Sequence, residues 1–124
     1  MTSQRHDSRW TLVLRMICIF LFVFTFVMAA TPELPRLPGG LADKSLHAIT
    51  FTVLSPLAAI AWPKVRLLGL AVLLSGFGGL IEGVQAIPAL HRDAELLDWL
   101  ADVAAIGLGL AIVLLVRMNG ARSQ

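Results

Sequence analysis

Pairs of ionisable or amide side chains recur at helical spacing inside segments that are otherwise strongly apolar. These pairs are Asp43 and His47, Glu82 and Gln85, and Asp98 and Asp102. Residues three or four positions apart lie on one face of a helix, so each pair forms a single polar face. A carboxylate that faces lipid costs at least about 2.5–3.5 kcal/mol. We therefore expect these faces to turn towards one another or towards a water-filled pocket.

The residue types in these pairs suit acid–base chemistry or the binding of a polar ligand. Glu82 and His47 are the candidates for an acid–base or hydrogen-bonding centre, because carboxylate and imidazole groups are the usual proton carriers of such sites. The candidate ligand-binding residues are Asp43, Lys44, Gln85, Arg92, Asp98 and Asp102. Among these, Lys44 and Arg92 carry the positive charge that a phosphate or another anionic group would need.

A structural role is the alternative for each of these residues. Buried polar networks can fix how helices pack without binding a ligand. Asp43 is a typical N-cap for the helix that follows it, and Gln85 can bridge two helices. The segment that contains His91, Asp93 and Glu95 is typical of a solvated loop.

Other chemistries lack their usual sequence signals. The chain has no HExxH pattern and no His-rich spacing, so we expect neither a metal centre nor a cofactor. Ser45 lies two residues before His47 and therefore points to a different helix face, and no GxSxG turn is present for a serine nucleophile. The net charge is +2, but the basic residues are scattered, so nucleic acid is not an expected partner.

The elements that position these residues are predicted to be membrane-spanning helices. Of 124 residues, 57% are hydrophobic and 15% are charged, and a soluble domain of this length cannot hide so much apolar surface. A helix needs about 20 apolar residues to cross the hydrocarbon core. Segments of this kind occur at 10–30, 45–62, 67–87 and 97–116. Their short connections predict one all-α domain, an up-down bundle of four transmembrane helices.

The distribution of Lys and Arg predicts the orientation of this bundle. One side would carry Arg5, Arg9, Arg15, Lys64, Arg66, Arg117 and Arg122. Since basic residues concentrate on the cytoplasmic side, we expect both termini to lie in the cytoplasm. His47, Glu82 and Asp102 would then all lie about 5–8 Å below the outer surface. This layer predicts an outward-facing polar pocket, and its position in one half of the bundle argues against a proton path across the membrane.

Two features of the first segment need separate interpretation. Residues 1–30 also have the outline of a cleavable signal peptide that ends at "VMAAT". The apolar core is long for that, and Met28 would be a poor fit three residues before the cut, so we favour a retained helix. Cys18 is the only cysteine and excludes an internal disulfide, which leaves it as a small packing residue.

The polar residues also resemble a known family. "DKSLHAITF" is similar to the D-K-x-x-H-x-x-x-F signature at the start of the second helix of VanZ-like proteins. "IEGVQ", an arginine and "LLDWLADVAAIGLG" resemble that family's later E-x-x-Q, R and D-x-x-x-N-x-x-G-x-x-x-G pattern, so the resemblance covers 43–112. The matching positions are Asp43, Lys44, His47, Phe51, Glu82, Gln85, Arg92, Asp98 and Gly109. Asp102 and Ala105 depart from it, because the family usually has Asn and Gly there.

The resemblance implies a small multi-pass protein of the bacterial inner membrane. The founding member of the family is associated with low-level resistance to the glycopeptide teicoplanin, by a mechanism that membership does not reveal. We therefore expect the pocket to bind or modify an anionic lipid or a cell-envelope precursor. A non-catalytic scaffold with a structural polar cluster is the alternative. Transport of a small solute fits less well, since a one-sided site lacks a second gate unless a homo-oligomer supplies it.

Overall fold

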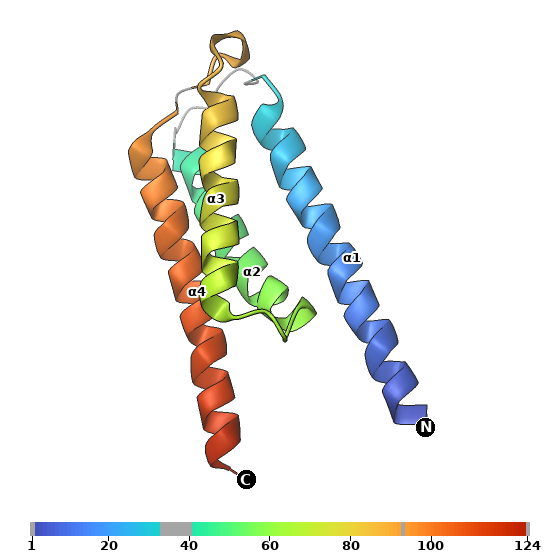
Figure 1. Cartoon of the computed structure of the whole chain (residues 1–124). Coiled ribbons are helices and arrows are strands. Elements are labelled where there is room, and N and C mark those ends of the chain that lie inside the picture. The colour runs from blue at the N-terminus through green and yellow to red at the C-terminus, as the bar shows by residue number, and fades with distance from the viewer. Residues whose placement is uncertain (1, 33–40, 93, 124) are drawn as a thin grey trace.

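The computed structural model describes residues 2–32, 41–92 and 94–123, and its side chains at 8–32, 47–92 and 94–123. The long helices are α1 (Thr2–Ala30), α2 (Leu41–Ala61), α3 (Leu67–Gln85) and α4 (Leu96–Arg122), with a short 3-10 helix η1 (Pro88–Leu90) before α4. They alternate in direction, so α1 begins and α4 ends at the same end of the bundle (Figure 1). The predicted all-α up-down bundle is confirmed.

The two ends of the bundle differ in what they carry. We call the end with the segment 86–95 the loop end, and the end where α1 begins and α4 ends the terminal end (Figure 1). The turn between α2 and α3, residues 62–66, faces the terminal end. α2 and α4 therefore start near the loop end, while α3 finishes there, which brings the polar residues of all three helices to the loop end.

The helices have the length and composition of membrane spans. Ser8–Ala30, Leu67–Gln85 and Leu96–Arg122 are each long and apolar enough to cross a bilayer. The described apolar part of α2 is shorter, His47–Ala61, but the whole helix has 21 residues and spans about 31 Å. Large apolar side chains of α1 are exposed to the surroundings, as with Phe20 at 65%. Such exposure over a whole helix is expected only where lipid is the solvent. The chain is a membrane protein.

The ends of the helices depart from the predicted boundaries. α1 begins at Thr2 rather than at Trp10, and α4 continues to Arg122 rather than ending at Val116. Both helices continue past their apolar segments into charged sequence, because no proline interrupts either extension. α2 begins at Leu41, so Asp43 lies within its first turn and not at its N-cap. The side chains of Asp43 and Lys44 lie outside the described residues.

The core forms where α4 packs against both α2 and α3. Its fully buried side chains include Phe51, Leu54, Leu74, Ile81 and Ile106. α1 packs on the side of α2 and α3 away from α4, and Cys18 is buried there as a packing residue, as expected.

Aromatic rings and one glycine shape these interfaces. The ring of Phe22 on α1 meets that of Phe77 on α3 edge-on, at 4.8 Å between centroids. α2 and α4 approach each other closely at Gly109. A Cβ atom there would lie 2.9 Å from the carbonyl oxygen of Thr52 and would also collide with the hydroxyl of Ser55.

At the terminal end, two arginines bind the last turn of α2. Arg15 on α1 donates from Nε to the carbonyl oxygen of Ala61 at 3.0 Å, and Arg117 on α4 donates from Nη2 to that of Ala59 at 3.1 Å. The last carbonyls of a helix lack partners within the helix and carry partial negative charge. The guanidinium groups therefore satisfy these carbonyls and join α1 and α4 to α2.

Candidate functional site

His47, Glu82 and Asp102 meet at the loop end of the bundle. They come from α2, α3 and α4, and one nitrogen or oxygen atom from each lies within 4.8 Å of the other two. We call these three residues the polar cluster. The spacing argument predicted this convergence from chain direction and rise per residue alone, and the structure places the three side chains together. Whether they act on a ligand is a separate question.

Asp102 is the most deeply buried member of the polar cluster. Its side chain is 1% exposed, and neither carboxylate oxygen has a hydrogen-bond partner among the described residues. Gly78 on α3 makes room for it, since a Cβ at Gly78 would lie 3.5 Å from Asp102 Oδ2 and 3.5 Å from the ring of Phe51. A buried polar group without a partner costs about 1–3 kcal/mol. This carboxylate is therefore placed to accept a hydrogen-bond donor or a cation.

Glu82 combines membership of the polar cluster with a contact to the start of α4. Its Oε2 atom accepts a hydrogen bond of 3.2 Å from the backbone N–H of Glu95, the residue at the N-cap of α4. The N-terminus of a helix carries partial positive charge, so a carboxylate is stabilised there. Glu82 thus links the end of α3 to the start of α4 and is held next to Asp102.

Arg92 lies at the loop end with its guanidinium group directed at α1. Its Nε donates to the carbonyl oxygen of Thr31 at 3.0 Å, and its Nη2 donates to that of Met28 at 3.2 Å. These carbonyls belong to the last turn of α1 and the residue that follows it. Just before Arg92, His91 adopts a left-handed backbone with φ of 50° and turns the chain after η1. Sequence reasoning treated Arg92 as an anion contact and missed this capping role, because no local pattern shows which helix end lies nearby.

The remaining candidates occupy different places. Gln85 is buried at the last position of α3, one turn beyond Glu82. Asp98 is half-buried in the first turn of α4 and is not part of the polar cluster. His91 and Glu95 are exposed on the connecting segment, as predicted. Asp93 lies outside the described residues.

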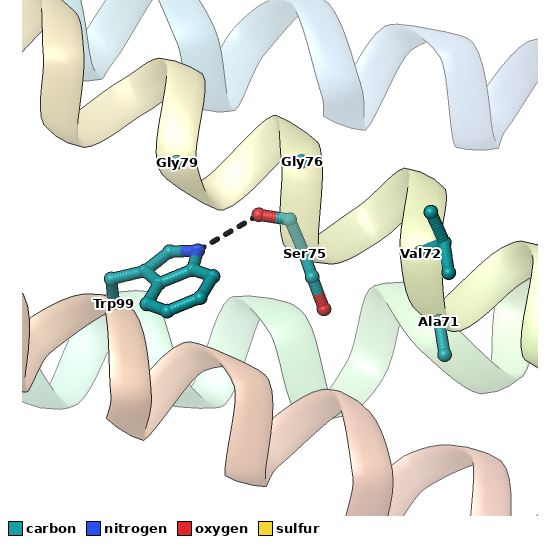
Figure 2. A pocket seen from close by; sticks show the side chains of 6 residues that line it. All are labelled: Ala71, Val72, Ser75, Gly76, Gly79 and Trp99. Carbon is teal, nitrogen blue, oxygen red and sulfur yellow. Dashed lines mark hydrogen bonds between the residues drawn. The ribbon is translucent and has the colours of Figure 1, made fainter.

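Trp99 is a feature that the sequence analysis did not single out. It lies one turn before Asp102 on α4, and its indole Nε1 donates to the carbonyl oxygen of Ser75 at 2.9 Å (Figure 2). The ring packs over Gly79, where a Cβ would lie 3.4 Å from Nε1. Beside it runs an open, mostly apolar groove of about 430 Å³, lined by Ala71, Val72, Ser75, Gly76, Gly79 and Trp99. The sequence signal that could have identified Trp99 is its position three residues before Asp102, on the same helix face.

Small residues recur at four-residue intervals on two helices, as Ser75, Gly79 and Gly83 on α3 and as Ala101, Ala105 and Gly109 on α4. Such a stripe usually allows helices to pack closely. Ser75 and Gly79 contact Trp99 of α4, but a Cβ at Gly83 would meet nothing within 4 Å. On α4, Ala105 and Gly109 are buried, while Ala101 is exposed. Only part of each stripe mediates contact between helices of this chain.

Comparisons of the chain with protein-family models, with curated proteins and with solved structures give no match. The VanZ-like resemblance accordingly remains an expectation drawn from the residues quoted above. What the geometry itself offers is a polar cluster of two carboxylates and one imidazole. Such a group can accept hydrogen bonds from hydroxyl or amine groups, and it can exchange a proton with them.

Proposed function

We propose that this chain is a VanZ-like protein of the bacterial inner membrane, with both termini in the cytoplasm. It would bind or modify the polar headgroup of an anionic lipid or a cell-envelope precursor at the polar cluster. The observation that carries this proposal is the convergence of His47, Glu82 and Asp102, with a buried Asp102 carboxylate to which no described residue donates a hydrogen bond. Hydroxyl or amine groups of a headgroup would supply that donor.

Each candidate residue has a role in this proposal. Glu82 and His47 form the acid–base or hydrogen-bonding centre, and Asp98 and Asp102 orient the ligand. The anionic part of the headgroup contacts Lys44 and Arg92, two of the three Lys and Arg residues that the sequence assigns to this end, with Arg36 the third. Arg92 has a second task, since its guanidinium group also caps α1. Gln85 and Asp43 complete the polar surroundings.

The groove beside Trp99 supports a lipid-like ligand. A Cβ at Gly78 would lie 3.6 Å from Trp99 Cδ1 and 3.5 Å from Asp102 Oδ2, so the indole ring and the Asp102 carboxylate both border Gly78. The ring also lines the groove. A ligand with a polar headgroup at the cluster could place an acyl chain in the groove, where small apolar residues offer dispersion contacts but few polar partners.

Retention of lipid by the purified protein tests the proposal. Native mass spectrometry of the chain in detergent should reveal a bound anionic lipid or precursor, and Asp102→Asn, Glu82→Gln and His47→Ala should each reduce it about tenfold or more, as expected for a lost hydrogen bond to a charged group. Lys64→Gln, at the terminal end, is the control and should leave retention unchanged. The proposal fails if no anionic lipid is retained, or if the cluster variants retain as much as Lys64→Gln.

A scaffold whose polar residues only brace the bundle is the second candidate. Two contacts favour it, the bond from the Glu95 N–H to Glu82 and the capping of α1 by Arg92. Thermal unfolding of the same variants separates the candidates. A scaffold predicts that all three cluster variants lose stability and that lipid retention follows stability. A binding site predicts that retention falls in variants that unfold at nearly the normal temperature.

The family resemblance also raises a link with glycopeptide resistance, which the same variants address. A teicoplanin-susceptible host that expresses the chain should become less susceptible, and Glu82→Gln, at a position that matches the family pattern, should abolish the change. No change in susceptibility on expression of the unaltered chain would remove resistance from the proposal while leaving headgroup binding to its own test.

A further inference from the structure

The charge of the polar cluster points to a positive occupant. Two carboxylates and one imidazole present ligand atoms within 4.8 Å of one another. Like charges at such a distance repel strongly where water is excluded. The described guanidinium group at this end, that of Arg92, donates to the carbonyls of Met28 and Thr31. The cluster is thus better matched to a cation than to the anionic part of a headgroup.

We propose that His47, Glu82 and Asp102 bind a divalent transition-metal ion of the Zn²⁺ class. Imidazole nitrogen and carboxylate oxygen are both ordinary Zn²⁺ ligands, and three protein ligands plus one open position is the usual arrangement of a reactive Zn²⁺ site. Hard ions such as Ca²⁺ and Mg²⁺ prefer oxygen-only surroundings, and the imidazole selects against them. A metal was not expected from the sequence, because ligands that come from three different helices leave no characteristic spacing along the chain.

Two observations beyond the clustering of the residues support a metal. The Asp102 side chain is 1% exposed, and within the part of the chain that the structure describes neither carboxylate oxygen has a hydrogen-bond partner, although one of them lies within 4.8 Å of the other two ligand atoms. Glu82 is in turn positioned by the backbone N–H of Glu95. Metal-binding carboxylates commonly have an outer hydrogen bond of this kind, which fixes their orientation.

The distances are compatible with coordination after a small contraction. Tetrahedral Zn²⁺ with bonds of about 2.0–2.2 Å places its ligand atoms about 3.3–3.6 Å apart. The cluster is wider than this, and His47 and Glu82 are only half-buried, so rotation of their side chains can close the difference. The open coordination position would receive water or an oxygen of the headgroup. Only this last step rests on the proposed function.

Zn²⁺ binding by the full-length chain tests the inference. The protein is purified in detergent without a histidine tag, treated with chelator and titrated with Zn²⁺ under calorimetry. We expect about one Zn²⁺ per chain, and an affinity about 100-fold or more lower in Asp102→Asn and His47→Gln, since loss of an outer-shell partner alone costs 10–100-fold. His91→Gln is the control, because it removes an exposed imidazole from the same end. It should bind Zn²⁺ as the unaltered chain does.

X-ray absorption at the zinc edge tests the site on the unaltered chain, so its result does not depend on whether a variant folds. The spectrum of the unaltered chain should show one imidazole, with oxygen for the other ligands and no sulfur. No stoichiometric binding, several imidazoles, a sulfur ligand or equal affinity in Asp102→Asn would each overturn the inference. Lipid retention is measured separately on the metal-free chain. Retained lipid without Zn²⁺ binding would reject the metal site and leave the headgroup proposal standing. Zn²⁺ binding without retained lipid would reject the headgroup proposal and leave the metal site standing.

Discussion

The indole Nε1 of Trp99 donates a hydrogen bond of 2.9 Å to the backbone carbonyl oxygen of Ser75, across the interface between α4 and α3. The ring packs against Gly78 and Gly79, where an added Cβ atom would lie in van der Waals contact with it, at 3.6 Å and 3.4 Å. Asp102 lies one turn further along α4, on the same face as Trp99. The contact therefore sets the rotation of α4 against α3 and directs Asp102 towards Glu82 and His47.

Replacement of Trp99 by Phe should weaken the interface between α3 and α4 without leaving a large cavity. Trp99→Phe keeps an aromatic ring but removes the N–H donor, so the free energy of unfolding should fall by about 1 kcal/mol. Thermal unfolding in detergent measures the effect. Trp10→Phe is the matched control, because Trp10 is 59% exposed on α1, and it should have little effect on stability. Equal losses in both variants would show that the Trp99 contact does not stabilise the bundle.

The two glycines of α4 at 107 and 109 should respond in opposite directions to alanine. A Cβ at Gly109 would crowd the Thr52 carbonyl and the Ser55 hydroxyl of α2, and forced overpacking typically costs about 1–3 kcal/mol. A Cβ at Gly107 would meet nothing within 4 Å, and alanine there should stabilise the helix by up to about 1 kcal/mol. Unfolding temperatures of the two variants provide the comparison. A stable Gly109→Ala protein would contradict the close approach of α2 and α4.

The arginines that bind the last turn of α2 should matter more than neighbouring arginines of equal charge. Arg15→Leu and Arg117→Leu each remove a charge-assisted hydrogen bond at a helix C-terminus, and each should cost about 1 kcal/mol. Arg9→Leu and Arg122→Leu remove the same charge from exposed positions of the same two helices. Chemical denaturation in mixed micelles should separate the two pairs. If all four variants lose the same stability, net charge and not the contact with α2 is responsible.

The parts of this structure that followed from the sequence are those that depend on position along one helix. Apolar runs and the prolines between them predicted four spans, and the direction of each span then gave the depth of His47, Glu82 and Asp102. Arg92 shows the limit of this approach. Its partners, the carbonyls of Met28 and Thr31, lie far away in the sequence, and no periodic pattern identifies which helix end an arginine will reach.

The same limit applies to the helix ends and to Trp99. Hydropathy placed the predicted helix boundaries where the apolar sequence ends. A helix continues until a residue such as proline interrupts it, so α1 and α4 extend into polar sequence. Nothing in the sequence distinguished Trp99, because tryptophan is common near membrane boundaries. Its partner, the carbonyl oxygen of Ser75, belongs to another helix, and such a contact is visible only after the helices have packed.

The last turn of α2, where Arg15 and Arg117 bind, also has a consequence for the surrounding bilayer. α2 and α3 turn back at 62–66, whereas α1 and α4 continue beyond them, so the protein narrows from four rods to two on that side (Figure 1). α2 is about 31 Å long and can cross the hydrocarbon core, so the step lies at the membrane surface. Lipid phosphates beside it can reach the guanidinium groups of Arg15 and Arg117, and the chain should accordingly enrich acidic phospholipids in this leaflet.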